Sequence, residues 1–448
     1  MKILRKTVLL VLLALVAQVQ LVAAEPAYTE AQARAYAKEV LPLVEKAAGR
    51  RFKTTPPLKL SNSESVVPVI PRYLSPQFYV LFPELTNDQI RRAEKESSGP
   101  FAVRILGIYD VPSKGVTVFP LNLPARMALA NVDPKLYPQI AEIVIAHELA
   151  HALQDQAAGL GRDSERGNAY TTKAVIEGQA TLIMGKVANA LGYSAAMNEF
   201  LRCLKVGWSK SSDPAVEILL QPARRLFSYS YINGSDFLMK QEKQGGPDLV
   251  WNILKNPPAS MAMVFGEKPY SSKASDVPDY RFALKGIESK LGAGKSMVRS
   301  FPIEEAVLRA VIETLGDDKR NIVRDNLRGT HAVLKSGRKE RSSVTLFVAK
   351  SAAASAALES VLDELNRRNI NAAEKSESAK LTAKTVAAFP GVKDGKAKKI
   401  SFTSESTAVT IVRAVRGAAI VQVSLQGTKL SDKQIAGILN EVFSRLAR

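Results

Sequence analysis

Two histidines and a glutamate carry the clearest chemistry in this chain. His147, Glu148 and His151 form the pattern HExxH. Residues four apart lie on the same face of a helix, so the two imidazoles can bind one metal ion. Glu148 lies one step around the helix from His147, where its carboxylate can reach a water on the metal without binding the metal itself. The pattern predicts zinc-dependent hydrolysis with Glu148 as the general base.

The residues around the motif strengthen this interpretation, because five-residue patterns recur by chance. The sequence predicts a helix over 137–158 that is apolar on nearly all sides, as in a buried helix. Unpaired polar groups are costly to bury. A metal site therefore explains two histidines and a glutamate on this helix better than a purely structural role does.

Zinc in a hydrolase needs a third protein ligand. The only other histidine of the chain, His331, is distant in sequence. Glu177 is the best candidate, because it is the only acidic residue of a predicted helix over 171–191. Small residues beside Glu177 would let this helix lie close to the HExxH helix. Glu165 and Asp163, in a glycine-rich loop, are the alternatives.

Catalysis also needs a donor for the oxyanion of the reaction. Since no further histidine follows closely, a tyrosine is expected, with Tyr231 as the first choice and Tyr229 as the second. Asp155, four residues after the second histidine, could orient a metal ligand. The predicted strand over 115–119 is the candidate edge that would hold an extended peptide by β-pairing.

The stretch HELAHALQDQ (147–156), followed by VIEGQATL (175–182), resembles bacterial secreted zinc metallopeptidases of the gluzincin type. Weaker similarity extends the resemblance over about residues 100–270. The resemblance implies that His147, His151 and Glu177 bind Zn²⁺ and that Glu148 is the general base.

One feature of the family is missing from this chain. Relatives often carry a histidine just before a segment like Glu267-Lys268-Pro269-Tyr270, and this chain has Phe265-Gly266 there. A catalytic contribution from that histidine would be absent here.

The expected fold class is α+β. A gluzincin-like zincin domain over 25–285, with a small antiparallel sheet over a helical core, is followed by a smaller C-terminal α+β domain over 300–448. Residues 271–300 are rich in Ser, Lys and Gly and are expected to form a linker. Because every proposed ligand precedes residue 180, metal binding should survive removal of the C-terminal domain.

Several local elements are predicted outside the motif. Thr29 should begin a helix that Pro42 kinks or splits. Strands are expected over 101–108 and 115–119, joined by a turn. Near the C-terminus the sequence predicts a hairpin over 408–425, which turns at Arg416-Gly417, and a last helix over 432–446.

The N-terminus and the composition indicate an exported, ordinary globular protein. Lys2, Arg5 and Lys6 precede an apolar run over 8–17, which is typical of a secretory signal peptide over residues 1–24. The rival interpretation is an uncleaved anchor. Bacterial export, to the periplasm or the medium, is therefore expected, with no membrane span after signal removal. A single cysteine, Cys203, excludes an intrachain disulfide.

The 448 residues include 62 Lys and Arg against 43 Asp and Glu, for a net charge of +19. This balance is typical of a solvated surface tuned for solubility. The alternative is a surface for anionic partners, among them cell-envelope polymers. Nucleic acid is not expected, because only 6% of residues are aromatic and no basic run is interleaved with aromatic residues.

The predicted function is an exported zinc metalloendopeptidase that acts on proteins or peptides. One alternative is an inactive zincin-fold binding or scaffold protein of the cell envelope, and another is a zinc hydrolase of non-peptide bonds. Gly292-Ala293-Gly294-Lys295-Ser296 resembles a phosphate loop, but its first glycine is replaced by Ser289. No histidine near Cys203 supports cysteine chemistry.

Overall fold

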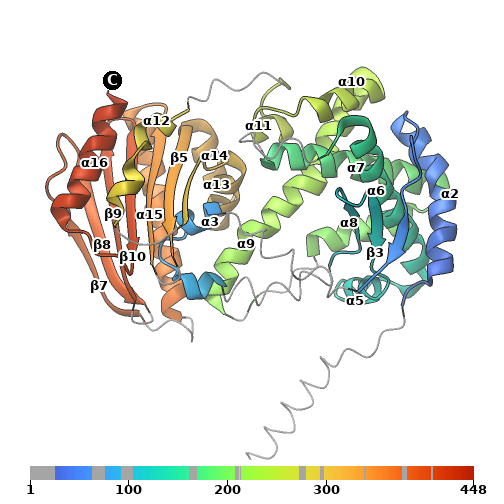
Figure 1. The fold of residues 1–448 in the computed structure, drawn as a ribbon, viewed down its shortest axis with the longest axis horizontal. Coiled ribbons are helices and arrows are strands. Elements are labelled where there is room, and N and C mark those ends of the chain that lie inside the picture. The colour runs from blue at the N-terminus through green and yellow to red at the C-terminus, as the bar shows by residue number, and fades with distance from the viewer. Residues whose placement is uncertain are drawn as a thin grey trace, which may run out of the picture.

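The computed structural model describes residues 26–62, 76–91, 104–160, 169–206, 211, 213–271, 279–292, 297–337, 340–375, 381–404 and 407–447. These residues form a mixed α+β structure with two lobes (Figure 1). The helical lobe comprises the described residues of 26–62 and 104–271. The sheet lobe comprises the described residues of 76–91 and 279–447.

The helical lobe is built around two long neighbouring helices, α6 and α7. Its helices in chain order are α2 (Glu30–Ala48), α5 (Asn122–Ala128), η3 (Pro134–Leu136), α6 (Tyr137–Ala158), α7 (Ala169–Leu191), α8 (Ser194–Val206), α9 (Pro214–Ser228), the π-helical turn η4 (Tyr229–Asn233), α10 (Gly234–Lys255) and α11 (Met261–Val264). Helix α9 lies between the two lobes (Figure 1).

A small sheet lies against α6 in the order β1-β3-β2. Its strands are β1 (Leu58–Leu60), β2 (Gly107–Asp110) and β3 (Gly115–Val118). Strand β3 pairs with β2 antiparallel and with β1 parallel. The sheet is therefore mixed, and the prediction of a purely antiparallel small sheet is wrong.

The sheet lobe contains a seven-stranded sheet in the order β4-β5-β6-β10-β9-β8-β7, with every neighbouring pair antiparallel. Helices α15 and α16 pack in different apolar clusters beside it. The strands are β4 (Met297–Phe301), β5 (Leu327–Ser336), β6 (Arg341–Ala349), β7 (Leu381–Ala388), β8 (Lys396–Ser404), β9 (Thr407–Arg416) and β10 (Ala419–Gln426). The helices are α3 (Pro76–Leu81), α12 (Arg281–Leu284), η5 (Ile287–Lys290), α13 (Glu305–Ile312), η6 (Glu313–Leu315), α14 (Lys319–Asn326), α15 (Ala352–Lys375) and α16 (Asp432–Leu446).

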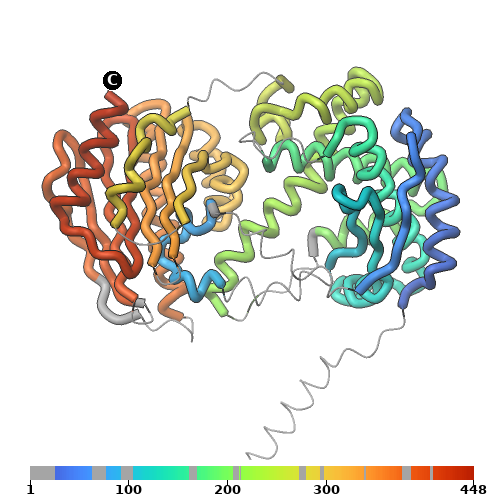
Figure 2. The backbone as a smooth tube through the Cα atoms, in the orientation of Figure 1, coloured from blue at the N-terminus to red at the C-terminus, as the bar shows by residue number. Residues whose placement is uncertain are grey.

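Residues 76–91 come early in the chain but belong to the sheet lobe, where α3 lies beside the strands (Figure 2). The buried guanidinium of Arg341 donates to the carbonyl oxygen of Leu85 at 2.6 Å. The side-chain amide of Gln426 donates to the same carbonyl at 3.1 Å. The chain thus passes from the helical lobe to the sheet lobe, back again, and then to the sheet lobe a second time.

Several local predictions agree with the structure. Thr29 caps α2 through a capping box with Gln32. Helices α6 and α16 have the predicted ranges, and β9 and β10 form the predicted hairpin. Pro42 lies inside α2 without dividing it, so the predicted split is wrong.

Two other local predictions differ from the structure. Tyr109 and Asp110 belong to strand β2 rather than to a turn. The expected linker over 271–300 includes α12, η5 and the start of β4, and its residues Leu284, Ile287 and Leu291 are buried in the sheet lobe. Apolar residues spaced for packing therefore override a polar composition in that segment.

Among the residues that the model describes, no helix has both the length and the apolar character needed to cross a membrane. The proposed signal peptide over 1–24 lies outside the described residues, so export stays a prediction. The domain boundaries at 285 and 300 also stay a prediction.

Candidate metal centre

Helix α6 presents its three motif residues inside the protein rather than on its surface. His147, Glu148 and His151 are all buried, with exposed fractions of 6%, 6% and 9%. Apolar residues cover the remaining sides of this stretch of the helix, and Gly159 ends it in a left-handed conformation at φ 75°. The helix is therefore fixed on all sides around the motif.

The side chains of His147, His151 and Glu177 converge on one point. The two histidine Nε2 atoms lie 3.1 Å apart. The Glu177 Oε2 atom lies 3.4 Å from each of them. Ligand atoms held about 2.0–2.1 Å from a tetrahedral zinc ion are separated by about 3.3–3.4 Å. The three atoms thus have the spacing of three corners of a zinc tetrahedron, and the group could hold a metal ion.

A hydrogen-bond network fixes the ring of His151. Its Nδ1 lies 2.8 Å from the Oε1 atom of Gln154. The Gln154 amide nitrogen donates to the Ile176 carbonyl at 2.8 Å and to Gln179 Oε1 at 3.0 Å. Gln154 Oε1 is therefore an acceptor, which assigns the ring proton of His151 to Nδ1. The Nε2 lone pair remains available for a metal, the usual outer arrangement of a metal-binding histidine.

Glu177 and the two imidazoles stabilise each other's charged forms. Burial raises the pKa of Glu177, but the two imidazoles outweigh it and hold that pKa well below its usual range. Burial lowers the pKa of His151, but Glu177 outweighs it and raises the value to about 9. Glu177 Oε2 is buried and, within the described part of the chain, has no hydrogen-bond donor. The donor set and this orphaned oxygen fit a divalent metal ion such as zinc.

Glu148 projects toward the small sheet, beside this group. Burial raises the pKa of its carboxyl, and the two imidazoles and the backbone N–H of Tyr109 act against that rise. Strand β2 approaches very closely here, because a Cβ at Gly107 would lie 2.5 Å from Glu148 Cγ. Gly107 is therefore needed for the close contact between β2 and the predicted base.

Comparisons with known proteins find a weak likeness in structure and none in sequence. No family model matches the chain, and no curated protein matches its sequence. Among solved structures it is similar to a "putative hydrolase with a novel fold" from Chloroflexus aurantiacus. That likeness has a TM-score of 0.36 at 15% identity, over 55% of this chain and 89% of the other.

The two candidate tyrosines lie on the same turn, η4, but face different neighbours. The ring of Tyr231 stacks on His147, with centroids 5.8 Å apart and planes at 20°. The hydroxyl of Tyr229 instead donates to Glu313 Oε2 of the sheet lobe at 2.6 Å. Tyr229 is therefore engaged elsewhere, and Tyr231 is the tyrosine beside the predicted ligands. π-Helical turns are often found at functional sites.

Three expectations about supporting residues differ from the structure. Asp155 does not orient a ligand: its Oδ2 accepts hydrogen bonds from Tyr109 Oη and Lys114 Nζ, both at 2.7 Å. Strand β3 is the central strand of the small sheet, so β2, and not β3, is the edge beside Glu148. The small residues beside Glu177 were expected to bring its helix close to the HExxH helix. Gly178 instead faces Gly234 of α10, where an added Cβ would lie 2.4 Å from the Gly234 carbonyl carbon.

Gln154, which orients His151, is not among the site residues predicted from the sequence. Its signal was available, since it lies three residues after His151 on the buried helix. Because an amide side chain adds little to apolar packing, a glutamine at this position indicates a hydrogen-bonding role. The alternative ligands Asp163 and Glu165 lie outside the described residues.

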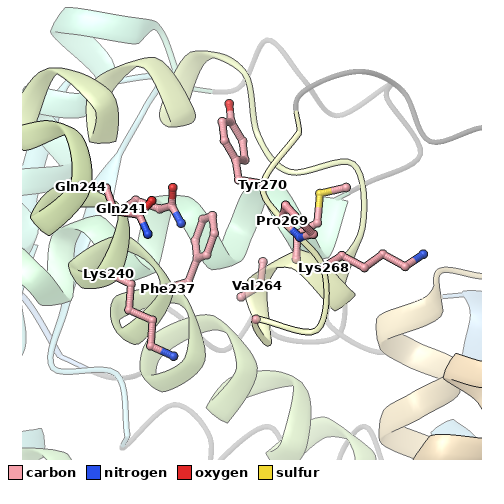
Figure 3. Close-up of a pocket in the computed structure, with 10 residues that line it drawn as sticks. Phe237, Lys240, Gln241, Gln244, Val264, Lys268, Pro269 and Tyr270 are labelled. Carbon is pink, nitrogen blue, oxygen red and sulfur yellow. The ribbon is translucent and has the colours of Figure 1, made fainter.

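The weaker motif segment around 264–270 packs against α10 and encloses a pocket of about 370 Å³ (Figure 3). Its lining includes Phe237, Gln241, Gln244 and Tyr270. None of the predicted metal ligands lines this pocket. Phe265, near the position where the resemblance implies a histidine, meets Tyr229 edge-on at 4.8 Å between ring centroids.

The two remaining candidate side chains, those of Cys203 and His331, each contact a neighbour inside the protein. Cys203 is buried, and its Sγ lies 3.7 Å from Met127 Sδ. Burial raises the pKa of this thiol, which argues against a nucleophile. His331 lies in the sheet lobe with its Nε2 2.8 Å from Ser300 Oγ. The phosphate-loop-like residues 293–296 lie outside the described residues.

Proposed function

We propose that this chain is an exported, zinc-dependent peptidase of the gluzincin type. The observation that carries the proposal is the convergence of His147 Nε2, His151 Nε2 and Glu177 Oε2 at separations of 3.1 to 3.4 Å. Two imidazoles and one carboxylate are the protein ligands of zinc in a well-known class of peptidases. The proposed substrates are proteins or peptides.

Glu148 would act as the general base and then as the general acid. Zinc, when bound at the three ligands, would lower the pKa of water and polarise the carbonyl of the scissile bond. Glu148 takes a proton from the attacking water and delivers it to the nitrogen of the leaving amine. Burial raises the pKa of this carboxyl, which makes it a stronger acceptor for the proton of the water.

Strand β2 would hold the substrate chain. It lies at the edge of the small sheet, and its backbone passes directly over Glu148 at Gly107. An extended peptide could add to this edge by main-chain hydrogen bonds, which brings its backbone close to the base. Tyr231, stacked on His147, is the proposed donor to the oxyanion of the reaction.

The direct test is metal analysis of the purified protein together with digestion of casein or a peptide library. The wild type should contain about one zinc ion per chain and cleave. Glu148→Gln should retain zinc and lose activity by about 10²-fold to 10⁴-fold. A protein that binds zinc but cleaves neither substrate would favour the inactive scaffold, and equal activity in Glu148→Gln would exclude Glu148 as the base.

A further inference from the structure

We infer that the sheet lobe positions the metal centre, and that Tyr229 and Glu313 are the positioning residues through which it does so. The inference rests on the proposed metal site and extends it to the control of His147. It assigns a role to the sheet lobe, which supplies none of the predicted metal ligands.

The two histidines of the motif are oriented by different means. His151 is held by the hydrogen bond between its Nδ1 and Gln154. The corresponding Nδ1 of His147 is buried and has no hydrogen-bond partner within the described ranges. The ring of His147 instead lies nearly parallel to that of Tyr231, with centroids 5.8 Å apart. The orientation of His147 therefore depends on where Tyr231 is held.

Tyr231 is held by a turn that the sheet lobe fixes. Two residues earlier in η4, the hydroxyl of buried Tyr229 donates to Glu313 Oε2 at 2.6 Å. Arg225 donates to the same oxygen and to the Glu313 carbonyl, both at 3.0 Å. Hydrogen bonds to a buried carboxylate are among the strong ones. A shift of Glu313 should therefore move Tyr229 and, through the short turn, Tyr231.

A second contact from the sheet lobe reaches Tyr229 through Phe265. Arg309 lies one helical turn before Glu313 and is 1% exposed. Its guanidinium donates to both carboxylate oxygens of Glu267, at 2.7 and 3.0 Å, and lies 4.8 Å over the ring of Phe265. Phe265 meets the ring of Tyr229 edge-on. The segment over residues 267–270 thus helps to join the two lobes through Glu267.

The helix that carries Glu177 is fixed by the same lobe. At the start of α7, the backbone N–H of Tyr170 donates to Glu304 Oε2 of the sheet lobe at 2.9 Å. Further along α7, Gly178 contacts Gly234 so closely that neither position has room for a Cβ. Helix α7 and η4 therefore cannot shift independently. These contacts predict that loss of residues 300–448 would disturb the metal centre, contrary to the expectation from the order of the ligands in the sequence.

The experiment compares four variants of the full chain: Glu313→Ala, Glu313→Gln, Tyr229→Phe and, as the matched control, Asp317→Ala. Asp317 is an exposed carboxylate that also contacts Arg225, at 3.3 Å. The first measurement is the NMR signal of the His147 ring in the metal-free protein, which senses the ring current of Tyr231. His331 provides an internal reference for the fold of the sheet lobe. The second is a titration with Co²⁺, followed by its visible absorption bands.

Glu313→Ala and Tyr229→Phe should shift the His147 signal, leave the His331 signal in place and weaken Co²⁺ binding by about tenfold. Glu313→Gln, whose amide oxygen can still accept from Tyr229, should restore much of both. Asp317→Ala should behave like the wild type. An unchanged His147 signal and Co²⁺ affinity in both Glu313→Ala and Tyr229→Phe would overturn the inference. A wild type that takes up no Co²⁺ would refute the proposed function, while the His147 signal would still test the coupling.

Discussion

Buried polar groups are arranged differently in the two lobes. In the sheet lobe, the buried guanidinium of Arg413 donates to Gln422 Oε1 and to Asp363 Oδ1, both at 2.6 Å. In the helical lobe, two imidazole nitrogens and a Glu177 carboxylate oxygen converge within 4.8 Å of one another. A donor facing its acceptors completes a structural network, whereas two imidazoles and a carboxylate that converge on one point can also bind a metal ion.

This difference distinguishes a site from a core without reference to the sequence motif. Variants that remove the converging groups should lose the metal, and variants that leave these groups in place should keep it.

Removal of both imidazoles should have the largest effect. The double variant His147→Ala/His151→Ala should contain no bound zinc, because one carboxylate does not make a zinc site. The measurement is the zinc content of purified protein by elemental analysis. Zinc retained at one ion per chain would show that the metal is bound elsewhere.

Replacement of the third ligand should have the next largest effect. Glu177→Ala should weaken zinc binding by more than about 100-fold, beyond the usual effect of an outer residue. Glu165→Ala, the rival carboxylate, should remain near the wild type. Competition with a chelator measures both affinities. The reverse order of the two variants would mean that Glu165 is the ligand and that the gluzincin interpretation needs replacement.

Loss of the residue that orients His151 should have a moderate effect. Gln154→Ala removes the acceptor for Nδ1 and should weaken zinc binding by about 10-fold to 100-fold. Gln156→Ala is the matched control, because Gln156 bonds instead to the backbone of Thr54 on the surface. Chelator competition again gives the values. Equal affinities for the two variants would exclude Gln154 from the site.

Disruption of the network in the sheet lobe should leave zinc binding unchanged at low denaturant concentration. Arg413→Ala leaves the buried Gln422 Oε1 without its donor and should lower the free energy of unfolding by about 1–3 kcal/mol. Asp363 is 42% exposed and keeps its ion pair with Lys398, so its loss of Arg413 adds little. Urea denaturation measures the loss, and elemental analysis measures the zinc. A variant that folds normally but has lost its zinc would contradict the distinction between the two lobes.

The motif helix and its neighbour were predictable because their signals are local. HExxH lies on a helix of nearly continuous apolar character, and Glu177 is the single acid of the next helix. The roles of Gly178 and Asp155 were not predictable in the same way. Gly178 faces α10, and Asp155 binds Tyr109 of β2, so both roles depend on packing between distant segments.

The order of strands in the small sheet was also hidden from the sequence. The pairing of β1 with β3 joins residues 58–60 to 116–118, and only this contact makes β3 a central strand. A short alternating segment predicts a strand but not its neighbours. The proposed substrate edge therefore shifts from the predicted strand to β2.

The early segment over residues 76–91 has a consequence for how the protein is made. The carbonyl of Leu85 is bound by Arg341 and Gln426, which lie 256 and 341 residues further along the chain. During synthesis this segment cannot form its native contacts until β10, the last strand of the large sheet, has been made. Contacts of such long sequence separation slow folding. Release of nearly the whole chain should therefore precede completion of the sheet lobe.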